Sequence, residues 1–210
     1  MRFKMLNIAF EDTNALYRKG MELFLKDVFS GEQNKNVKFN SLTSVNSPHV
    51  DIIVKNFVAG AEYVCQPILK FRRKPGLIIG ITDGEKNCHH NDLPLCIKNI
   101  VFVHRSESLN SIRENVTRAW KDNLQNQNFL QVKKCLQCKY RTLTPQQVTI
   151  AKHLLRGCDI MDIAELMNVN VKTVSAHKRL MMRKFNLSSD CELLQFLNNL
   201  KMHNPPVNLF

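Results

Sequence analysis

The decisive stretch is LTPQQVTIAKHLLRGCDIMDIAELMNVNVKTVSAHKRLMMRKFNL, residues 143–187. Its apolar residues recur at helical spacing between polar turns, which predicts three successive helices. The first begins where Thr144 can cap it, Pro145 suits its first position and Gln147 completes a capping box. Gly157 is placed to end this helix.

Working outward, the second helix is expected over residues 160–167 and the third over 171–185, separated by a turn at 168–170. A fourth helix is expected from Ser188 to Leu200. A short helix, a tight turn and a longer helix with a basic face form the helix-turn-helix pattern. Residues 141–203 are therefore predicted to be an all-α, four-helix, helix-turn-helix domain.

The third helix has two different faces. Val174, Met181 and Phe185 form its apolar face, which is expected to pack on the domain. The stretch 171–185 holds five Lys or Arg residues and no acid. Such a helix suits the major groove, where basic side chains reach guanine acceptors and phosphates, although an ordinary amphipathic helix with a solvated basic face is the alternative. The candidate DNA-binding residues are Lys172, Thr173, Ser175, Ala176, Lys178, Arg179, Arg183 and Lys184.

The stretch also resembles the LuxR/NarL DNA-binding domain. The matching pieces are Leu143-Thr144-Pro145, Gly157, Ile163-Ala164, Val171-Lys172-Thr173-Val174, His177 and Lys184. The resemblance implies that the third helix enters the major groove and that the fourth forms a dimer contact. Packing of all the fourth-helix leucines inside the domain is the alternative.

The N-terminal part predicts a different architecture. Short apolar runs bounded by turn residues suit strands buried in a parallel sheet. Strands separated by helical stretches favour a doubly wound α/β domain, which we place at residues 1–120. The expected strands are 5–10, 51–57, 76–82 and 100–103, and the expected helices are 15–28 and 111–120.

This part resembles a response-regulator receiver domain. Receivers carry acidic residues after the first strand, a phosphoacceptor Asp after the third, Thr or Ser after the fourth and Lys after the fifth. Here Glu11-Asp12 and Thr82 match, but Asn56 stands at the acceptor position and Arg105 at the Lys position. An amide cannot accept a phosphoryl group as a carboxylate does. The resemblance therefore implies a degenerate receiver.

A wider resemblance joins both halves. It rests on AGAEYVCQPILKFRRKPGLIIGITDGE (59–85), LPLCIKNIVFVHRSESLNSI (93–112), KTVSAHK (172–178) and SSD (188–190). These stretches resemble the auxiliary regulators that pair with the response regulator of the Rcs phosphorelay. The resemblance implies a non-phosphorylated activator that works as a heterodimer on a silenced sugar-utilisation operon.

Composition supports a nucleic-acid partner. The formal net charge is +12, which suggests a polyanion, although a merely basic soluble protein has the same charge. No signal peptide or membrane span is apparent, so a cytoplasmic protein is expected. We place a linker at 121–140. Within it, Cys135 and Cys138 form only half of a zinc-binding motif or a possible redox pair. Cys88-His89-His90 is an even weaker indication of a metal site. We expect surface thiols, no metal and no cofactor.

Two other functions stay open. A phosphorylated response regulator is disfavoured by Asn56. A LuxR-type receptor for a small ligand should have a sensor half richer in aromatics, and a ligand-induced rise in melting temperature would identify it. An enzyme is not expected, because no nucleophile, base and orienting group occur together. Operator sequence, regulated genes, sign of regulation and homodimer versus heterodimer stay open.

Overall fold

The computed structural model describes residues 5–31, 36–70, 72, 76–84, 93–97, 99–125 and 141–203. Most of the expected linker, with Cys135 and Cys138, lies outside the described residues, as does Cys88-His89-His90. The chain forms two compact units. Within the described residues, the first holds 5–57, 68–84, 95–97 and 99–125, and the second holds 58–67, 93–94 and 141–203.

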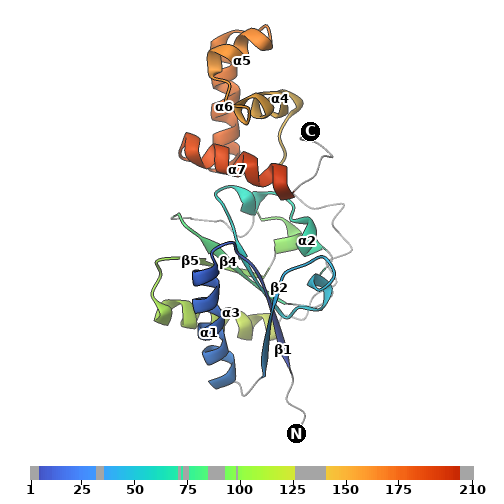
Figure 1. The fold of residues 1–210 in the computed structure, drawn as a ribbon, viewed down its shortest axis with the longest axis vertical. Helices are drawn as coiled ribbons and strands as arrows, with labels where there is room; N and C mark the ends of the chain where they lie inside the picture. The colour runs from blue at the N-terminus through green and yellow to red at the C-terminus, as the bar shows by residue number, and fades with distance from the viewer. Residues whose placement is uncertain are drawn as a thin grey trace. The chain divides into compact units, whose positions relative to one another are not determined.

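The first unit is built on a parallel five-stranded sheet with the strand order β2-β1-β3-β4-β5 (Figure 1). Every neighbouring pair is parallel. This is the order of flavodoxin-like doubly wound folds, and it confirms the predicted receiver-like α/β class. The strands are β1 (Leu6–Glu11), β2 (Val37–Ser41), β3 (Ile52–Asn56), β4 (Leu77–Thr82) and β5 (Ile100–His104).

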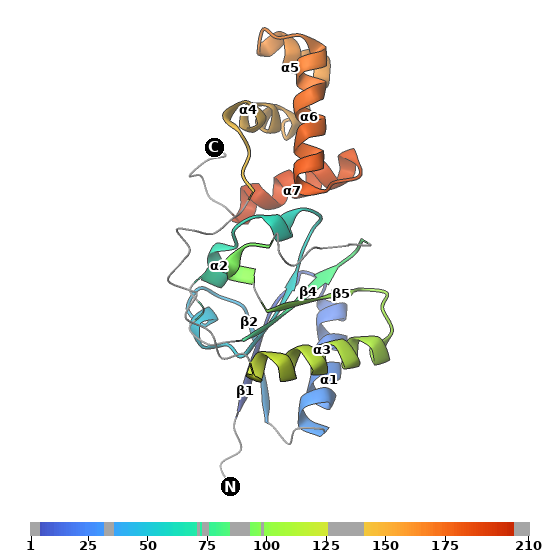
Figure 2. The same ribbon diagram turned by 180° about the vertical axis from the view of Figure 1, so that it is seen from behind.

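Two long helices, α1 (Ala15–Gly31) and α3 (Leu109–Gln125), share one core with one face of the sheet (Figure 2). Phe29 of α1 meets Trp120 of α3 edge-to-face, with ring centroids 5.6 Å apart. Strand residues such as Ile79 are fully buried in the same cluster. The strand side chains on this face of the sheet are buried because these helices cover them.

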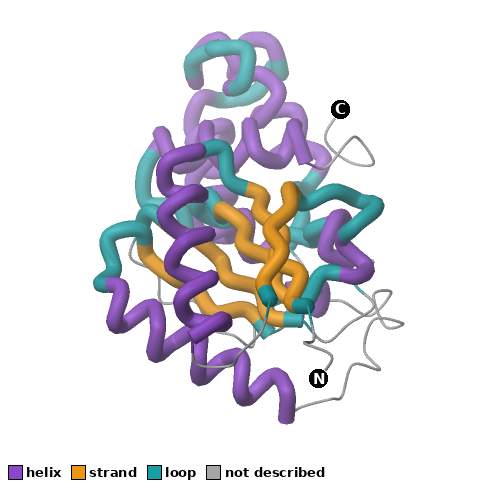
Figure 3. The backbone as a smooth tube through the Cα atoms, turned by 60° about the horizontal axis from the view of Figure 1, so that its bottom comes forward, coloured by secondary structure: helices purple, strands orange, loops and turns teal. Residues whose placement is uncertain are grey.

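The other connections contain no helix of comparable length in their described parts (Figure 3). Between β2 and β3 there is only η1 (Ser47–His49), a 3-10 turn. The sequence predicted strands alternating with helical stretches; among the described residues, a long helix lies only between β1 and β2, and the other long helix, α3, follows β5. The other short pieces are η2 (Ala61–Tyr63), which belongs to the second unit, α2 (Pro67–Lys70) and η4 (Leu95–Ile97).

The second unit contains four helices in its described C-terminal part: α4 (Pro145–Leu154), α5 (Ile160–Leu166), α6 (Val171–Phe185) and α7 (Asp190–His203). The predicted four-helix architecture is confirmed, and the expected capping box of Thr144 and Gln147 is present. Asp159 forms a second capping box at α5. Among the described residues, no helix is both long and apolar enough to cross a membrane.

Candidate DNA-binding surface and receiver-like site

The ends of α6 are set by asparagines. The side chain of Asn170 caps the start of the helix by accepting a hydrogen bond from the backbone N–H of Lys172 at 2.8 Å. Asn168 in the turn before α6 and Asn186 just after it have φ of 51° and 55°. Asparagine enters this left-handed region more readily than most other non-glycine residues. These asparagines thus fix where α6 begins and ends.

Helix α6 buries one face and exposes the other, as predicted from its sequence. Val174, Met181 and Phe185 are buried. Five of the candidate DNA-binding residues are exposed: Lys172, Thr173, Ala176, Arg179 and Arg183. Ser175, Lys178 and Lys184 are partly buried. A convex helix surface with exposed cations, no acid and a small residue between them can approach a DNA groove closely.

Lys178 differs from the other candidates. Its ammonium lies 2.6 Å from Oδ2 of Asp190 at the start of α7, and only 16% of its side chain is exposed. The same carboxylate is well placed at the N-terminal end of α7, where negative charge is favoured. Lys178 therefore ties α6 to α7, and its charge is already partly neutralised.

Helix α7 keeps one leucine outside the core. Leu193, Leu197 and Leu200 are buried, whereas Leu194 is 40% exposed. Phe196 is also fully buried, with its ring centroid 4.4 Å from that of Phe185, and our sequence interpretation did not include it. Leu194 is therefore the leucine of α7 that is available for a contact outside the domain.

The acidic residues at the start of α7 have roles inside the domain. Glu192 accepts hydrogen bonds from the backbone and hydroxyl of Ser188 at 2.8 and 2.9 Å. Ser189 accepts from the backbone N–H of Glu192 at 3.2 Å. These contacts explain why the helix begins at Asp190 and not at Ser188. Replacing Asp190 or Glu192 would disturb contacts inside the domain, so such variants are unsuitable as tests of a dimer contact.

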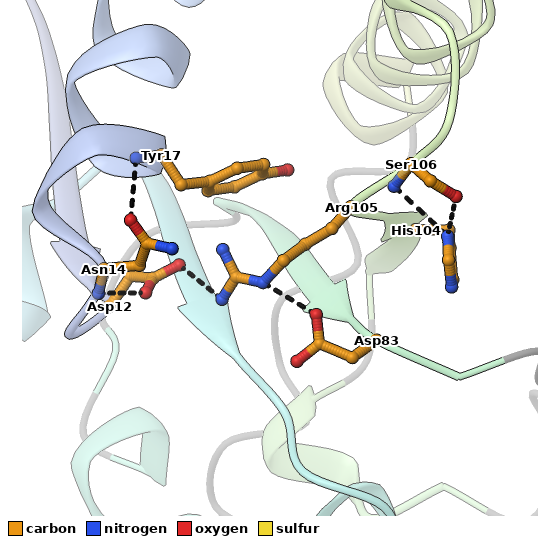
Figure 4. Close-up of polar contacts among 7 residues, drawn as sticks. All are labelled: Asp12, Asn14, Tyr17, Asp83, His104, Arg105 and Ser106. Carbon is orange, nitrogen blue, oxygen red and sulfur yellow. Dashed lines mark hydrogen bonds and ion pairs between the residues drawn. The ribbon is translucent and has the colours of Figure 1, made fainter.

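In the first unit, Asp12 and Arg105 lie close together at the carboxyl ends of the strands (Figure 4). Arg105 follows β5, and its Nη2 donates to Oδ2 of Asp12 at 2.9 Å. Its Nε lies 2.8 Å from Oδ1 of Asp83, and its guanidinium stacks 4.3 Å from the ring centroid of Tyr17. The Asp12 side chain is only 1% exposed. One arginine thus neutralises a buried carboxylate and an exposed one.

A second carboxylate of this cluster, that of Glu11, is also paired with a cation. Glu11 ends β1, and its Oε1 lies 2.5 Å from the ammonium of Lys55 on the neighbouring strand β3. Lys55 is buried and directly precedes Asn56. The buried amide oxygen of Asn56 accepts no hydrogen bond from any described residue. Asn56, which the sequence analysis expected at the acceptor position, is therefore a neutral amide beside an ion pair.

The environment of Tyr17 reflects the same cluster. Burial raises the pKa of its phenol, and the nearby positive charge of Arg105 opposes part of that rise. No group of three or more His, Cys, Asp or Glu residues in the described part of the chain is arranged to hold a metal ion. Our sequence interpretation did not single out Lys55, Asp83 or Tyr17. Lys55 and Asp83 are next to Asn56 and Thr82 in the sequence, and Tyr17 lies against Arg105 in the structure.

These features define a class: a receiver-like α/β unit in a chain whose C-terminal helices carry a helix-turn-helix. Residues 141–197 match the family model of bacterial regulatory proteins of the luxR family, and they form a LuxR-family domain. The transcriptional activator protein BglJ of Escherichia coli K12 is 35% identical to this chain over 88 residues. That match covers 42% of this chain and about a third (34%) of BglJ.

Solved structures show a similar fold over most of the chain. The response regulator RcsB in a DNA complex has a TM-score of 0.55 and 17% identity, covering 94% of this chain and 100% of RcsB. RcsB of Salmonella enterica serovar Typhimurium, bound to the promoter P1flhDC in the presence of BeF3⁻, has a TM-score of 0.56 and 15% identity. That match covers 93% of this chain and 98% of the solved chain. At this identity the likeness concerns the fold.

Proposed function

We propose that this chain is a sequence-specific DNA-binding transcription activator that works in the bacterial cytoplasm, without phosphorylation, beside a response regulator of the Rcs type. The observation that carries the DNA-binding part is α6, whose basic outer face is exposed while its apolar face is buried in a LuxR-family domain. Activation is supported by the similarity to BglJ, which is named a transcriptional activator.

The proposed DNA contacts divide into two groups. Arg179 lies near the middle of the exposed face and would reach base edges, helped by close approach at Ala176 and Ser175. Lys172, Thr173, Arg183 and Lys184 would hold phosphates. Lys178 could join them only by leaving Asp190.

The DNA-binding part is tested with the variant Arg179→Ala. We expect its operator affinity to fall by about 1–3 kcal/mol if the guanidinium contacts a base in bidentate fashion. Arg156→Ala is the control, because Arg156 is exposed just after α4 and outside α6. Fluorescence anisotropy on a labelled duplex measures both. Equal affinity of Arg179→Ala and the wild type would contradict this placement of α6.

Independence from phosphorylation is proposed because the acidic residues of the receiver-like site are already paired with cations. Glu11 and Asp12, which would be needed for a divalent cation, are paired with Lys55 and Arg105. Asn56 offers no carboxylate to accept a phosphoryl group. Incubation with acetyl phosphate and Mg²⁺, followed by intact-mass measurement, should give no stable phosphorylated species. A stable added phosphate on the wild-type chain would overturn this part.

A heterodimer follows from the loss of this switch. A switch needs two states that a signal can bias, and without an acylphosphate the receiver-like unit retains use as a docking surface. A second subunit would supply the other half-site, and two linked DNA-binding domains gain affinity through effective concentration. Leu194 on α7 is the proposed contact within the C-terminal domains. We also propose that the C-terminal domain begins at residue 141, whereas the expected boundary at residue 120 moves to 125, because α3 of the first unit continues to Gln125.

The heterodimer is tested by measuring operator binding with and without purified RcsB. We expect tighter binding of the mixture than of either protein alone. Leu194→Asp should remove this gain while leaving the melting temperature of the chain unchanged, because the side chain lies outside the core. Equally tight binding by this chain alone would contradict the heterodimer.

A further inference from the structure

Leu180 is an exposed apolar side chain on α6, close to exposed basic residues of the helix. It is 44% exposed, although the helix already has a complete apolar face in Val174, Met181 and Phe185. At about 100° per residue, Leu180 lies about 40° around the helix from Ala176 and about 60° from Arg183. It therefore shares the DNA-facing side of the helix with residues of the proposed interface.

The surroundings of Leu180 are open and positively charged. Together with Gln147, Arg183 and Lys184 it lines an open hollow of about 540 Å³ between the start of α4 and the second half of α6. The guanidinium of Arg183 and the ammonium of Lys184 attract phosphates to the rim of this hollow, but they offer no apolar partner for Leu180. A duplex that approaches α6 would bring base edges toward this leucine.

Thymine is the base that presents an apolar group in the major groove. Its 5-methyl group distinguishes it from cytosine, which offers an amino donor in that groove. Resting on the proposed DNA-binding function, we propose that Leu180 is a specificity-determining residue that contacts a thymine 5-methyl group in the operator. Arg179 would then recognise a base by hydrogen bonds, and Leu180 would recognise a thymine by burial of apolar surface.

The size of the effect follows from the group that is buried. Removing one methyl group from an apolar contact should weaken binding about fourfold. Deoxyuridine in place of thymidine makes this change alone, because it keeps the base-pairing edge and lacks the methyl group. The contribution of Leu180 is then isolated by combining the DNA change with Leu180→Ala.

The experiment uses the full chain together with purified RcsB, and a duplex enriched by this mixture from a randomised pool. Each thymidine of the enriched site is replaced in turn by deoxyuridine, and affinity is measured by anisotropy. With wild-type protein, at least one replacement should weaken binding about fourfold. With Leu180→Ala, the same replacement should have no further effect.

Leu166→Ala is the matched control, since Leu166 is also an exposed leucine of the C-terminal domain but lies on α5 and belongs to no proposed contact. This variant should keep the full deoxyuridine effect. A full effect in Leu180→Ala at every position would overturn the proposal. If Leu180→Ala weakened association with RcsB without changing the deoxyuridine effect, Leu180 would belong to a protein contact. If no duplex were enriched at all, the proposed DNA-binding function would fail as well.

Discussion

Replacing Arg105 by alanine should destabilise the first unit strongly, because it leaves the Asp12 carboxylate buried without its cation. Asp12 is 1% exposed and Arg105 19% exposed. Breaking a buried ion pair by removing one partner costs about 3–5 kcal/mol. Water can reach the space left by a partly exposed guanidinium, so we expect the lower end, about 3 kcal/mol. The exposed contact with Asp83 adds little, at about 0–1 kcal/mol.

Arg113→Ala is the matched control for this variant. Like Arg105, Arg113 forms an ion pair with an aspartate, Asp27 at 2.6 Å, and lies over an aromatic ring, that of Phe24 at 5.5 Å. Both members of its pair are considerably more exposed than Asp12. An exposed pair contributes about 0.2–1 kcal/mol, so the control should lose no more than that. The two variants thus separate burial from the mere loss of an arginine.

The chain contains a convenient probe for this measurement. Trp120 is its single tryptophan, and it is buried in α3 of the first unit. Urea unfolding followed by tryptophan fluorescence therefore reports the first unit separately from the C-terminal helices, which a two-domain protein requires. Arg105→Lys should give an intermediate loss, since an ammonium keeps a charge near Asp12 but lacks the planar fork. An equal loss for Arg105→Ala and Arg113→Ala would refute the reasoning.

Three further changes test the C-terminal domain. Thr144→Ala removes the capping box of α4 and should cost about 1 kcal/mol, measured by chemical denaturation with far-ultraviolet circular dichroism. Asn186→Ala should lose about 1–2 kcal/mol in the same assay because φ is +55°, whereas Asn186→Gly should be tolerated; equal losses would contradict the backbone argument. Asp190→Asn releases the ammonium of Lys178, so binding to all duplexes should strengthen and its salt dependence should steepen by up to about one unit. An unchanged salt slope would show that Lys178 does not reach phosphate.

The fold class could be predicted because it depends on features that are local in sequence. Apolar runs became β1, β3, β4 and β5, and helical periodicity with cap residues located α4 to α7. The edge strand β2 was not predicted. Its sequence VKFNS mixes apolar and polar residues, and its side chains are at most partly buried, so it lacks the continuous apolar run of the central strands.

Contacts between distant residues could not be predicted in the same way. Arg105 meets Asp12 across 93 positions of sequence, and Lys55 meets Glu11 across 44. The resemblance to receivers placed three of these side chains near one edge of the sheet, but only the structure shows which cation neutralises which acid. The ion pair between Lys178 and Asp190 could not be predicted either, because the periodicity of α6 does not indicate a partner on α7.

The pairing of Arg105 with Asp12 and Asp83 also has a consequence for timing. A phosphorylated regulator loses its signal when the phosphoryl group is hydrolysed, so the hydrolysis rate limits how long it stays active. An ion pair built into the chain does not expire in this way. A regulator that works as proposed would therefore respond only as fast as the protein is made, diluted and degraded, and the duration of its output would be set by its own turnover.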